Sequence, residues 1–573
     1  MGFICGILGR RDPAVARAMA RALNHRGEAH FFDGESYSVA ASTLGGPPPA
    51  LMDGTPRDHA GRPLAPAQLS AQCNEASSPD KLSLTGPFAA AVSMNQGHHW
   101  WLLRDRFGVQ PLYFHHGHGF LLFGSELKAL LASDLAPKRI NLLGVDRYLT
   151  LRCVPGPDTI LQGIHRVRPG CVLQYANDAV AETPFAEFDL GLEPVSRKAA
   201  ATRVRGLLQE ALARETSDTI LWSAGIDCAT LAGLHRGLQA VFVSLERGWQ
   251  DEGRRAADSA QRLNLRLETK VAHRLSENTF NQAVYHLDEP LADATVLPLW
   301  LIAEAVRKVA PTVISGHGAD ELLGGFPRYH FLDRARGARG LVPASLFSEL
   351  SPSLPPNAFV RRGSRYLASL RDNLRAYLSL VSVFDLDERE ALYTDAMKSA
   401  VYDQDPDGVL GLLRYHFSDG DLTQNLLSFD LRVGLPDLLL TKCDRIAAAH
   451  GLTIHLPYLD DHLVDFVTTL PAKVKFGVRS KPLLRLATKG ILPGSVRLRP
   501  RRDFRIPQTG RLFQFIENLS RQVITQERVE ASGLFKWSYV DQILRSATHN
   551  VYRRRQFWAL LMFFGWYRAV MET

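Results

Sequence analysis

Two short segments place small residues and an aspartate where an apolar strand turns into a helix. Residues 223–228 (SAGIDC) follow the apolar run 219–222, and residues 315–321 (SGHGADE) follow the apolar run 311–314. Backbone N–H groups at the start of a helix, together with a hydroxyl such as that of Ser223, can cradle a phosphate. Residues 223–228 lack the lysine of a Walker-type loop, so the sequence does not predict a clamp of that type.

Each of the two segments carries one aspartate. At the carboxyl ends of parallel strands, Asp227 and Asp320 can hold one hydrated Mg²⁺ that bridges nucleotide phosphates. Aspartates at such positions also cap helices. The residue types alone leave both interpretations open.

The elements that must position these loops alternate between strands and helices. Strand patterns cover residues 219–223, 240–246 and 265–272, and helical patterns cover residues 229–238 and 254–264. This alternation predicts a parallel sheet whose ligands bind at the carboxyl ends of its strands. Beyond about Ala338 the chain has mostly helical periodicity.

The first part of the chain, residues 1 to roughly 190, has a different pattern. Short apolar strands, broken by Gly, Pro and His, cover residues 3–8, 98–105, 111–116, 119–126 and 166–176. Residues 185–194 then lead into the amphipathic helical pattern 197–215. Because 573 residues are too many for one hydrophobic core, we predict two domains, residues 1–190 and 196–573.

Composition excludes several classes of protein. The 46% hydrophobic and 22% charged residues are typical of a globular protein, and the net charge of +8 favours anionic ligands such as nucleotides without predicting nucleic acid binding. Six cysteines without a CxxC pair argue against a zinc site. The chain has no signal-peptide pattern and no apolar run long enough to predict a membrane span, so we expect a cytoplasmic protein.

The two loops together resemble those of the asparagine synthetases, which read SGGxDS and SGxGxDExxGG. The resemblance continues, in order, at residues 288–293 (DEPLAD), 435–439 (LPDLL), 442–445 (KCDR), 455–460 (HLPYLD) and 480–485 (SKPLLR). It implies an α+β, Ntn-hydrolase-like N-terminal domain that is a degenerate glutaminase. It also implies an α/β synthetase domain of the adenine-nucleotide α-hydrolase-like, PP-loop ATP pyrophosphatase type with a largely helical C-terminal part.

The resemblance also implies the roles of individual residues. Asp227 and Asp320 would hold Mg²⁺, and Lys481 would stabilise the negative charge that develops as an amine attacks an acyl-adenylate. The ATP-binding residues would be Ser223, Ala224, Gly225, Ile226, Asp227, Cys228, Ser244 and Gly316. Ala224 and Cys228 stand where the family has Gly and Ser, and a thiol is the poorer hydrogen-bond donor. The alternative for Lys481 is a solvated surface lysine.

The first domain departs from the glutaminase pattern that it otherwise resembles. The resemblance lies in residues 5–7 (CGI), 25–27 (HRG), 104–113 (RDRFGVQPLY) and 125–128 (SELK). In that family an N-terminal Cys attacks glutamine, whereas Cys5 is internal in this sequence. Residues 60–65 (AGRPLA) replace the NGEIYN segment, and losing the Asn donor of an oxyanion hole costs about 2.7–4 kcal/mol. We therefore do not expect glutamine hydrolysis.

Two branches of the family, the β-lactam synthetases and the lasso peptide cyclases, use an amine already present on the substrate. Position 317 distinguishes them: asparagine synthetases carry Glu or Asp, β-lactam synthetases carry Tyr, and lasso cyclases carry His, as this chain does. An imidazole of near-neutral pKa can deprotonate the attacking amine. His317 can equally be a packing or hydrogen-bonding residue.

The resemblance thus implies a lasso peptide macrolactam synthetase. With ATP and Mg²⁺ it would adenylate an Asp or Glu side chain of a precursor core peptide, and the peptide's N-terminal amine would then form an isopeptide bond. AMP and pyrophosphate would be released, and a leader peptidase and a leader-recognition protein would be partners. The alternatives are a glutamine- or ammonia-dependent asparagine synthetase or amidotransferase acting on a small acid, and a nucleotide-binding scaffold without activity.

Overall fold

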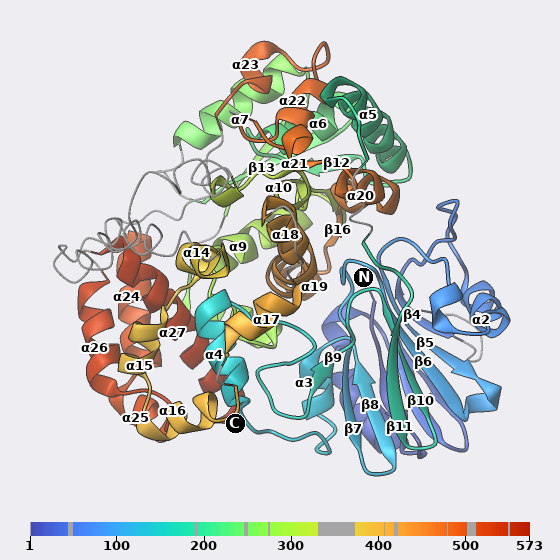
Figure 1. The fold of residues 1–573 in the computed structure, drawn as a ribbon, viewed down its shortest axis with the longest axis vertical. Coiled ribbons are helices and arrows are strands. Elements are labelled where there is room, and N and C mark those ends of the chain that lie inside the picture. The colour runs from blue at the N-terminus through green and yellow to red at the C-terminus, as the bar shows by residue number, and fades with distance from the viewer. Residues whose placement is uncertain are drawn as a thin grey trace.

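The computed structural model describes residues 2–43, 50–188, 193–245, 250–272, 275–329, 373–405, 407–416, 422–477, 479–500, 511–547 and 550–572. In Figure 1 the antiparallel strands lie at lower right, the parallel sheet lies at the top, and the C-terminal helices lie at lower left. The start of the predicted helical region, up to residue 372, lies outside the described residues, as do residues 189–192 and 501–510.

The first domain contains two antiparallel sheets that pack face to face, together with the helices α1 Pro13–Arg21, α2 Pro66–Glu75, α3 Leu127–Leu131 and α4 Leu142–Leu151. Their strand orders are β2-β3-β1-β8-β7-β9 and β11-β10-β6-β5-β4. The strands are β1 Ile4–Leu8, β2 His30–Asp33, β3 Tyr37–Ala41, β4 Ala50–Gly54, β5 Phe88–Met94, β6 His99–Arg104, β7 Tyr113–Gly117, β8 Phe120–Gly124, β9 His165–Arg166, β10 Cys171–Ala176 and β11 Ala179–Pro184. Apolar side chains of both sheets, including Ile4 and Leu102, form one buried cluster, as in other sandwiches. The strands predicted around β1, β6, β7 and β8 are confirmed.

A parallel sheet forms the centre of the second domain, with the strand order β14-β13-β12-β15-β16. Its strands are β12 Thr219–Leu221, β13 Gln239–Ser244, β14 Arg266–Val271, β15 Thr312–Ile314 and β16 Thr453–His455. The helices α5 Arg197–Ala213, α6 Ile226–Leu234, α7 Gln250–Arg262, α8 Glu277–Leu287 and α9 Val296–Arg307 alternate with the strands. The predicted parallel sheet is confirmed. Because β13 and β15 flank β12 on opposite sides, the loops that follow β12 and β15 border a crevice where ligands bind in such sheets.

The described chain from residue 373 onward is helical apart from β16 and short connections. Its longer helices include α14 Asn373–Val381, α18 Leu422–Phe429, α19 Thr441–Ala449, α20 Asp461–Thr468, α24 Arg511–Val523, α26 Trp537–Ser546 and α27 Val551–Val570. The apolar side chains of α27 belong to the main buried cluster, which explains the apolar C-terminal sequence. Residues Asp430–Leu440 form a π-helix that contains Pro436, a rare conformation often found at functional sites.

Buried charged residues join the two domains. The guanidinium of Arg26 lies 2.5 Å from Glu126 Oε1 in the first domain and also contacts Asp444 in α19. Arg445 Nη1 of the second domain lies 3.7 Å from Glu126 Oε1, and Lys128 Nζ of the first domain lies 2.7 Å from Asp288 Oδ1. Because a buried charge without a partner is strongly destabilising, these contacts hold the domains in one arrangement.

Among the helices of the described ranges, none combines the length and the apolarity that a bilayer crossing needs. All six cysteines are buried, and none forms a disulfide.

Candidate active site

The two aspartate-bearing loops lie side by side at the carboxyl ends of β12 and β15. A Cβ atom added at Gly316 would lie 3.0 Å from the Cβ of Asp227 and 3.4 Å from the backbone nitrogen of Cys228, so a side chain here would push the two loops slightly apart. The helix α6 begins after Gly225, and the helix α10 (Ala319–Leu323) begins after Gly318. Glycine therefore caps both helices, and the interpretation of Asp227 and Asp320 as helix caps is wrong.

Lys481 lies between the two aspartates. Its Nζ is 2.5 Å from Asp227 Oδ1 and 2.6 Å from Asp320 Oδ1. Only 2% of the lysine is exposed, so the alternative of a solvated surface lysine is wrong. Burial by itself would lower the pKa of Lys481, but the two carboxylates raise it above its ordinary value, and the side chain is a cation.

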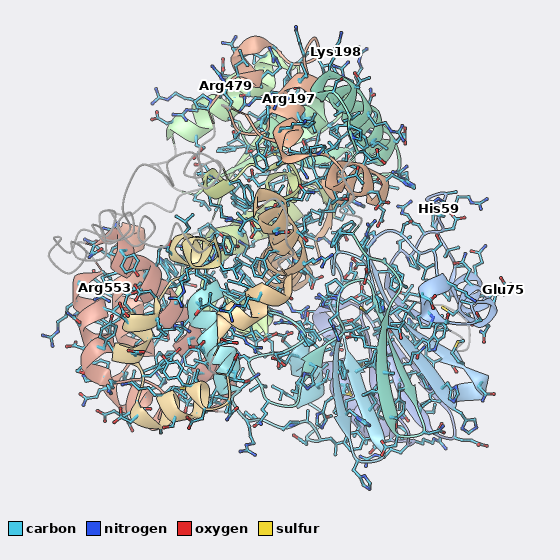
Figure 2. All side chains as sticks on the ribbon, in the orientation of Figure 1. His59, Glu75, Arg197, Lys198, Arg479 and Arg553 are labelled. Carbon is cyan, nitrogen blue, oxygen red and sulfur yellow. The ribbon has the colours of Figure 1, made fainter. Side chains whose placement is uncertain are left out.

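The backbone around Lys481 is held in an uncommon conformation. Its φ of +52° lies in the left-handed region, directly before Pro482 at the start of α22 (Pro482–Ala487). Arg197 anchors the preceding segment by donating hydrogen bonds to the carbonyl oxygens of Val474 (3.0 Å) and Phe476 (2.5 Å). Figure 2 shows Arg197 beside α21 (Ala472–Lys475) and α22. A non-glycine residue with a left-handed φ is strained, and such residues occur at functional sites, where the surrounding structure fixes the direction of the side chain.

Gly325 provides the space for this arrangement. An added Cβ would overlap Asp320 Oδ1 and the Cε of Lys481. The segment after Gly325 is fixed to the π-helix, because Arg328 Nη2 lies 2.6 Å from Asp430 Oδ2 and Tyr329 donates its hydroxyl to the same oxygen. Tyr377 donates a hydrogen bond of 3.0 Å to Asp430 Oδ1. No sequence motif marks Asp430, because its partners lie far from it in the sequence.

The residues of the two loops are suited to binding a nucleoside triphosphate with Mg²⁺. Ser223 and Gly225 are exposed at the entrance to α6, where backbone N–H groups can bind phosphate oxygens. Asp227 and Asp320 supply two carboxylates, and Mg²⁺ in nucleotide sites commonly takes one or two carboxylates plus phosphate oxygens and water. Tyr458 fixes the cradle from behind, since its hydroxyl donates a 3.0 Å hydrogen bond to the backbone oxygen of Asp227.

The remaining predicted ATP-binding residues lie on the same edge of the sheet or within α6. Ile226 is the first residue of α6 and its carbonyl accepts a 2.8 Å hydrogen bond from Thr230 Oγ1. Ala224 is half-buried between Ser223 and Gly225. Ser244 ends β13, the strand beside β12. Cys228 is buried, its Sγ accepts a hydrogen bond from Ser223 Oγ at 3.4 Å, and burial raises the pKa of the thiol.

His317 lies in the same loop as Asp320, with Nδ1 2.7 Å from Ser315 Oγ. Burial, with a smaller contribution from Lys442, lowers the pKa of His317 to about 4. The pKa of His317 is therefore lower than the near-neutral value that the sequence suggests. The imidazole is neutral at pH 7, where it can exchange hydrogen bonds but holds a proton only weakly.

Lys442 and Asp293 form a second buried ion pair near this loop. Lys442 Nζ lies 2.6 Å from Asp293 Oδ2 and 2.8 Å from Thr295 Oγ1. Both charged residues lie in matched motifs, but the sequence does not reveal their pairing because 149 positions separate them. The pair brings a fixed positive charge close enough to influence His317.

The thiol of Cys5 is enclosed in the first domain. Cys5 pairs with Ala40 of β3 on one side and with Gly124 of β8 on the other. The side chain has no exposed surface, and burial raises the pKa of its thiol well above the ordinary value. A buried, protonated thiol is a poor nucleophile.

Comparison with known proteins covers both domains. A family model described as asparagine synthase matches residues 203–568, and one described as a glutamine amidotransferase domain matches residues 75–186. A putative glutamine-hydrolyzing asparagine synthetase of Mycobacterium tuberculosis is 26% identical over 543 residues, covering 85% of this chain and 77% of the relative. The glutamine-hydrolyzing asparagine synthetase 1 of Bacillus subtilis is 24% identical over 509 residues, covering 85% and 78%.

Two further proteins resemble the chain at lower sequence identity. The amidase chyE of Penicillium rubens is 22% identical over 505 residues, covering 78% of this chain and 73% of the relative. A solved glutamine phosphoribosylpyrophosphate amidotransferase from Bacillus subtilis covers 58% of this chain and 77% of its own at 11% identity, but its TM-score of 0.22 carries no argument. The asparagine synthase match spans more than half of the residues, and the chain therefore belongs to the asparagine synthase family.

Proposed function

We propose that the chain is an ATP-dependent lasso peptide macrolactam synthetase, an AMP-forming amide ligase with a PP-loop synthetase domain. The observation that carries the ligase chemistry is Lys481, a buried cation 2.5 Å from Asp227 and 2.6 Å from Asp320. The enclosed thiol of Cys5 supports a reaction in which the amine does not come from glutamine. The peptide substrate rests on His317, which lasso cyclases of this family carry at the same place in the loop.

The proposed reaction has two steps. A carboxylate oxygen of an Asp or Glu side chain attacks the α-phosphorus of ATP, and pyrophosphate leaves as the acyl-adenylate forms. The N-terminal amine of the peptide then attacks the acyl carbon, the bond to AMP breaks, and the amine loses a proton. Lys481 stabilises the negative charge that develops on the carbonyl and phosphate oxygens, a contribution of several kcal/mol in a dry site.

The other site residues bind and orient. The N–H groups of residues 224–228 and the hydroxyl of Ser223 hold the phosphates, while Asp227 and Asp320 hold Mg²⁺, which neutralises phosphate charge. We propose His317 as the group that accepts the amine proton. In the structure its pKa is about 4, so this role requires the negative charge of the bound nucleotide to make the imidazole more basic.

The proposal includes partners. A core peptide with a free N-terminal amine requires a peptidase that removes a leader segment, and a protein that recognises the leader would bring the precursor to it. These partners follow from the lasso cyclase resemblance.

A glutamine- or ammonia-dependent asparagine synthetase is the second candidate. The names of the Mycobacterium tuberculosis and Bacillus subtilis relatives favour it, and so does the amidotransferase match over residues 75–186. Ammonia-dependent amide formation needs no thiol, so the enclosure of Cys5 does not count against it.

Pyrophosphate release by the purified protein with ATP and Mg²⁺ tests both candidates. One arm contains aspartate with glutamine or with ammonium, and the other contains a leader-free peptide with N-terminal Gly and an acidic residue several positions later. Turnover with the peptide alone, giving AMP and a product lighter by one water, is the expected result. Turnover with aspartate contradicts it, and Cys5→Ala then shows whether glutamine hydrolysis supplies the amine. Lys481→Met is the inactive control for either reaction.

A further inference from the structure

The guanidinium of Arg485, in α22, contacts three backbone oxygens on two segments of the chain. Its Nε donates a 2.8 Å hydrogen bond to the carbonyl oxygen of Ser480, and its Nη2 donates a 3.1 Å hydrogen bond to that of Arg499. Its Nη1 donates to the carbonyl oxygen of Arg497. Because a guanidinium carries its donors in a rigid planar fork, these bonds hold the two segments in one relative position.

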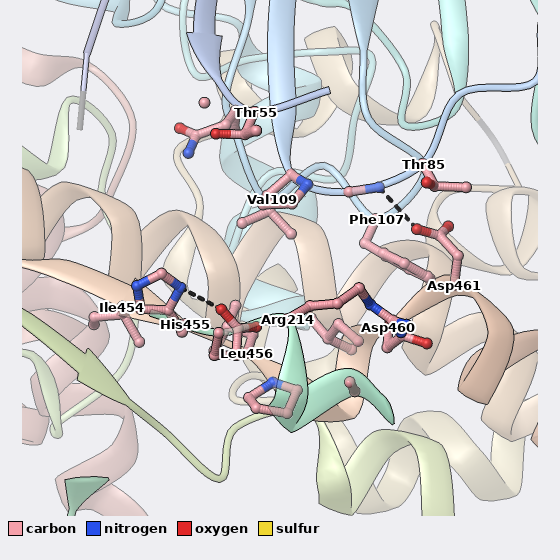
Figure 3. A pocket seen from close by; sticks show the side chains of 18 of the residues that line it. Thr55, Thr85, Phe107, Val109, Arg214, Ile454, His455, Leu456, Asp460 and Asp461 are labelled. Atoms are coloured by element: carbon pink, nitrogen blue, oxygen red, sulfur yellow. Dashed lines mark hydrogen bonds and ion pairs between the residues drawn. The ribbon is translucent and has the colours of Figure 1, made fainter. Parts of the chain in front are cut away.

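The charge of Arg485 is buried without an ion pair. In the described part of the chain its partners are carbonyl oxygens, although only 6% of the residue is exposed. Figure 3 shows the contrasting case of Arg214, which lines the cavity between the domains and pairs with Asp460. Burial and the neighbouring Arg479 lower the pKa of Arg485, while Asp227 raises it. Burying a charge in this way costs free energy, which favours a positioning role over simple packing.

The backbone that Arg485 holds is that of Lys481. Lys481 has a left-handed φ of +52°, a conformation that costs about 1–3 kcal/mol and persists only where the surroundings determine it. The side chain of Arg485 fixes the carbonyl of Ser480, and its backbone amide donates a 3.1 Å hydrogen bond to the carbonyl of Lys481. Arg485 therefore fixes the backbone on both sides of the residue whose Nζ reaches Asp227 and Asp320.

The second segment that Arg485 contacts is anchored to α7. Arg499 Nη2 lies 2.7 Å from Asp258 Oδ2, and its Nη1 donates a 2.6 Å hydrogen bond to Ser259 Oγ. The helix α7 packs against β13, which pairs with β12 in the parallel sheet. Arg485 thus connects the Lys481 segment to the framework of the sheet.

We propose that Arg485 is a positioning residue whose guanidinium fixes the backbone around Lys481 and thereby holds the Lys481 ammonium between Asp227 and Asp320. It acts through Lys481 rather than by contact with the substrate. The inference rests on the proposed function, because it concerns the same site and the same reaction.

Arg205 of α5 provides a matched control at the other end of α22. Its Nε donates a 2.5 Å hydrogen bond to the carbonyl oxygen of Ala487, and its Nη2 donates a 3.1 Å hydrogen bond to that of Lys489. The chemistry of the contacts is the same as for Arg485, but they lie at the end of the helix and not beside Lys481. Arg205→Ala should therefore loosen α22 without displacing the ammonium.

Pyrophosphate release at varied ATP concentration tests the role in turnover. Arg485→Ala should lower kcat by about 10- to 100-fold, because a small displacement of a catalytic group is that costly. The KM for ATP should stay within about threefold, since the phosphate-binding amides of residues 223–228 are unchanged. Arg485→Lys, which keeps a cation but loses the fork, should have an intermediate kcat. In Arg205→Ala, kcat should stay within about threefold of the wild type.

A double-mutant cycle tests whether Arg485 acts through Lys481. In a Lys481→Met background, Arg485→Ala should cause no further loss of kcat, because the side chain that Arg485 positions is already absent. Multiplicative losses in the double variant would overturn the proposal. So would equal losses of kcat in Arg485→Ala and Arg205→Ala.

Hydrogen exchange separates this inference from the proposed function. In Arg485→Ala the backbone amides of residues 479–485 should exchange faster than in the wild type, whereas Arg205→Ala should affect residues 487–491 instead. If the wild type releases no pyrophosphate with any acceptor, the proposed function fails, and faster exchange around Lys481 still supports the positioning by Arg485. Unchanged exchange in residues 479–485 would overturn the inference whether or not the enzyme turns over.

Discussion

Arg26 of the first domain donates hydrogen bonds to both carboxylate oxygens of Asp444 in the second domain, and both side chains are buried. The same guanidinium also reaches Glu126, so one side chain compensates two buried acids. The first domain thus remains joined to the second domain through charge pairs even though its thiol is enclosed.

Replacing Arg26 with Leu should destabilise the protein strongly. The change leaves Asp444 and Glu126 with one buried cation fewer, and breaking a buried pair typically costs about 3–5 kcal/mol. Urea unfolding followed by fluorescence and circular dichroism measures the loss. Arg62→Leu is the control, because Arg62 pairs with Asp58 at an exposed position where such pairs contribute about 0–1 kcal/mol. Similar midpoints for the two variants would show that the network does not couple the domains.

Replacing Lys481 with Met should reduce turnover by about 10²–10³, the effect typical of losing one preorganised charge-stabilising group. Binding of Mg²⁺ with a non-hydrolysable ATP analogue should persist or become tighter, because Lys481 no longer competes for Asp227 and Asp320. Pyrophosphate release and calorimetry measure the two effects. Lys489→Met, a control at an exposed position, should leave both unchanged. A loss of nucleotide binding equal to the loss of turnover would contradict the charge-stabilising role.

The stability of the protein should depend on pH through His317. Its pKa is about 4 in the fold against an ordinary value of 6.5, so the fold favours the neutral ring. This contribution to stability is fully present above pH 6.5 and is lost as the pH falls from 6.5 toward 4. The free energy of unfolding should decrease by on the order of 1–3 kcal/mol over that range. In His317→Gln, thermal midpoints measured across that range should fall less steeply than in the wild type. Parallel curves would mean that the imidazole titrates normally.

Replacing Cys228 with Ser should tighten binding of a non-hydrolysable ATP analogue by about two- to tenfold, because a hydroxyl is a better donor to phosphate than a thiol. Cys228 follows Asp227 in the first turn of α6, where the change adds no volume. Calorimetry measures the affinity, and Cys73→Ala, in the first domain, serves as the control. Weaker binding by the serine variant would show that the thiol's packing matters more than its polarity.

Local sequence was sufficient for much of the fold and for the residues of the candidate site. The apolar runs before residues 223 and 315, and the helices after them, follow from periodicity and small residues that act over a few positions. They predict a parallel sheet and two loops at its edge, which the structure contains. The strand β16 was missed, because Thr453–His455 contain a single apolar residue rather than an apolar run and become a strand by pairing with β15.

Tertiary structure alone decided how the site residues act. Lys481 lies 254 positions from Asp227, and only the packing of α22 beside the two loops makes it a buried cation between two carboxylates. The pKa of His317 depends on burial and on Lys442, which comes from another helix. Sequence patterns report the local preferences of the backbone, whereas desolvation and Coulomb interactions act through space between residues that the fold brings together.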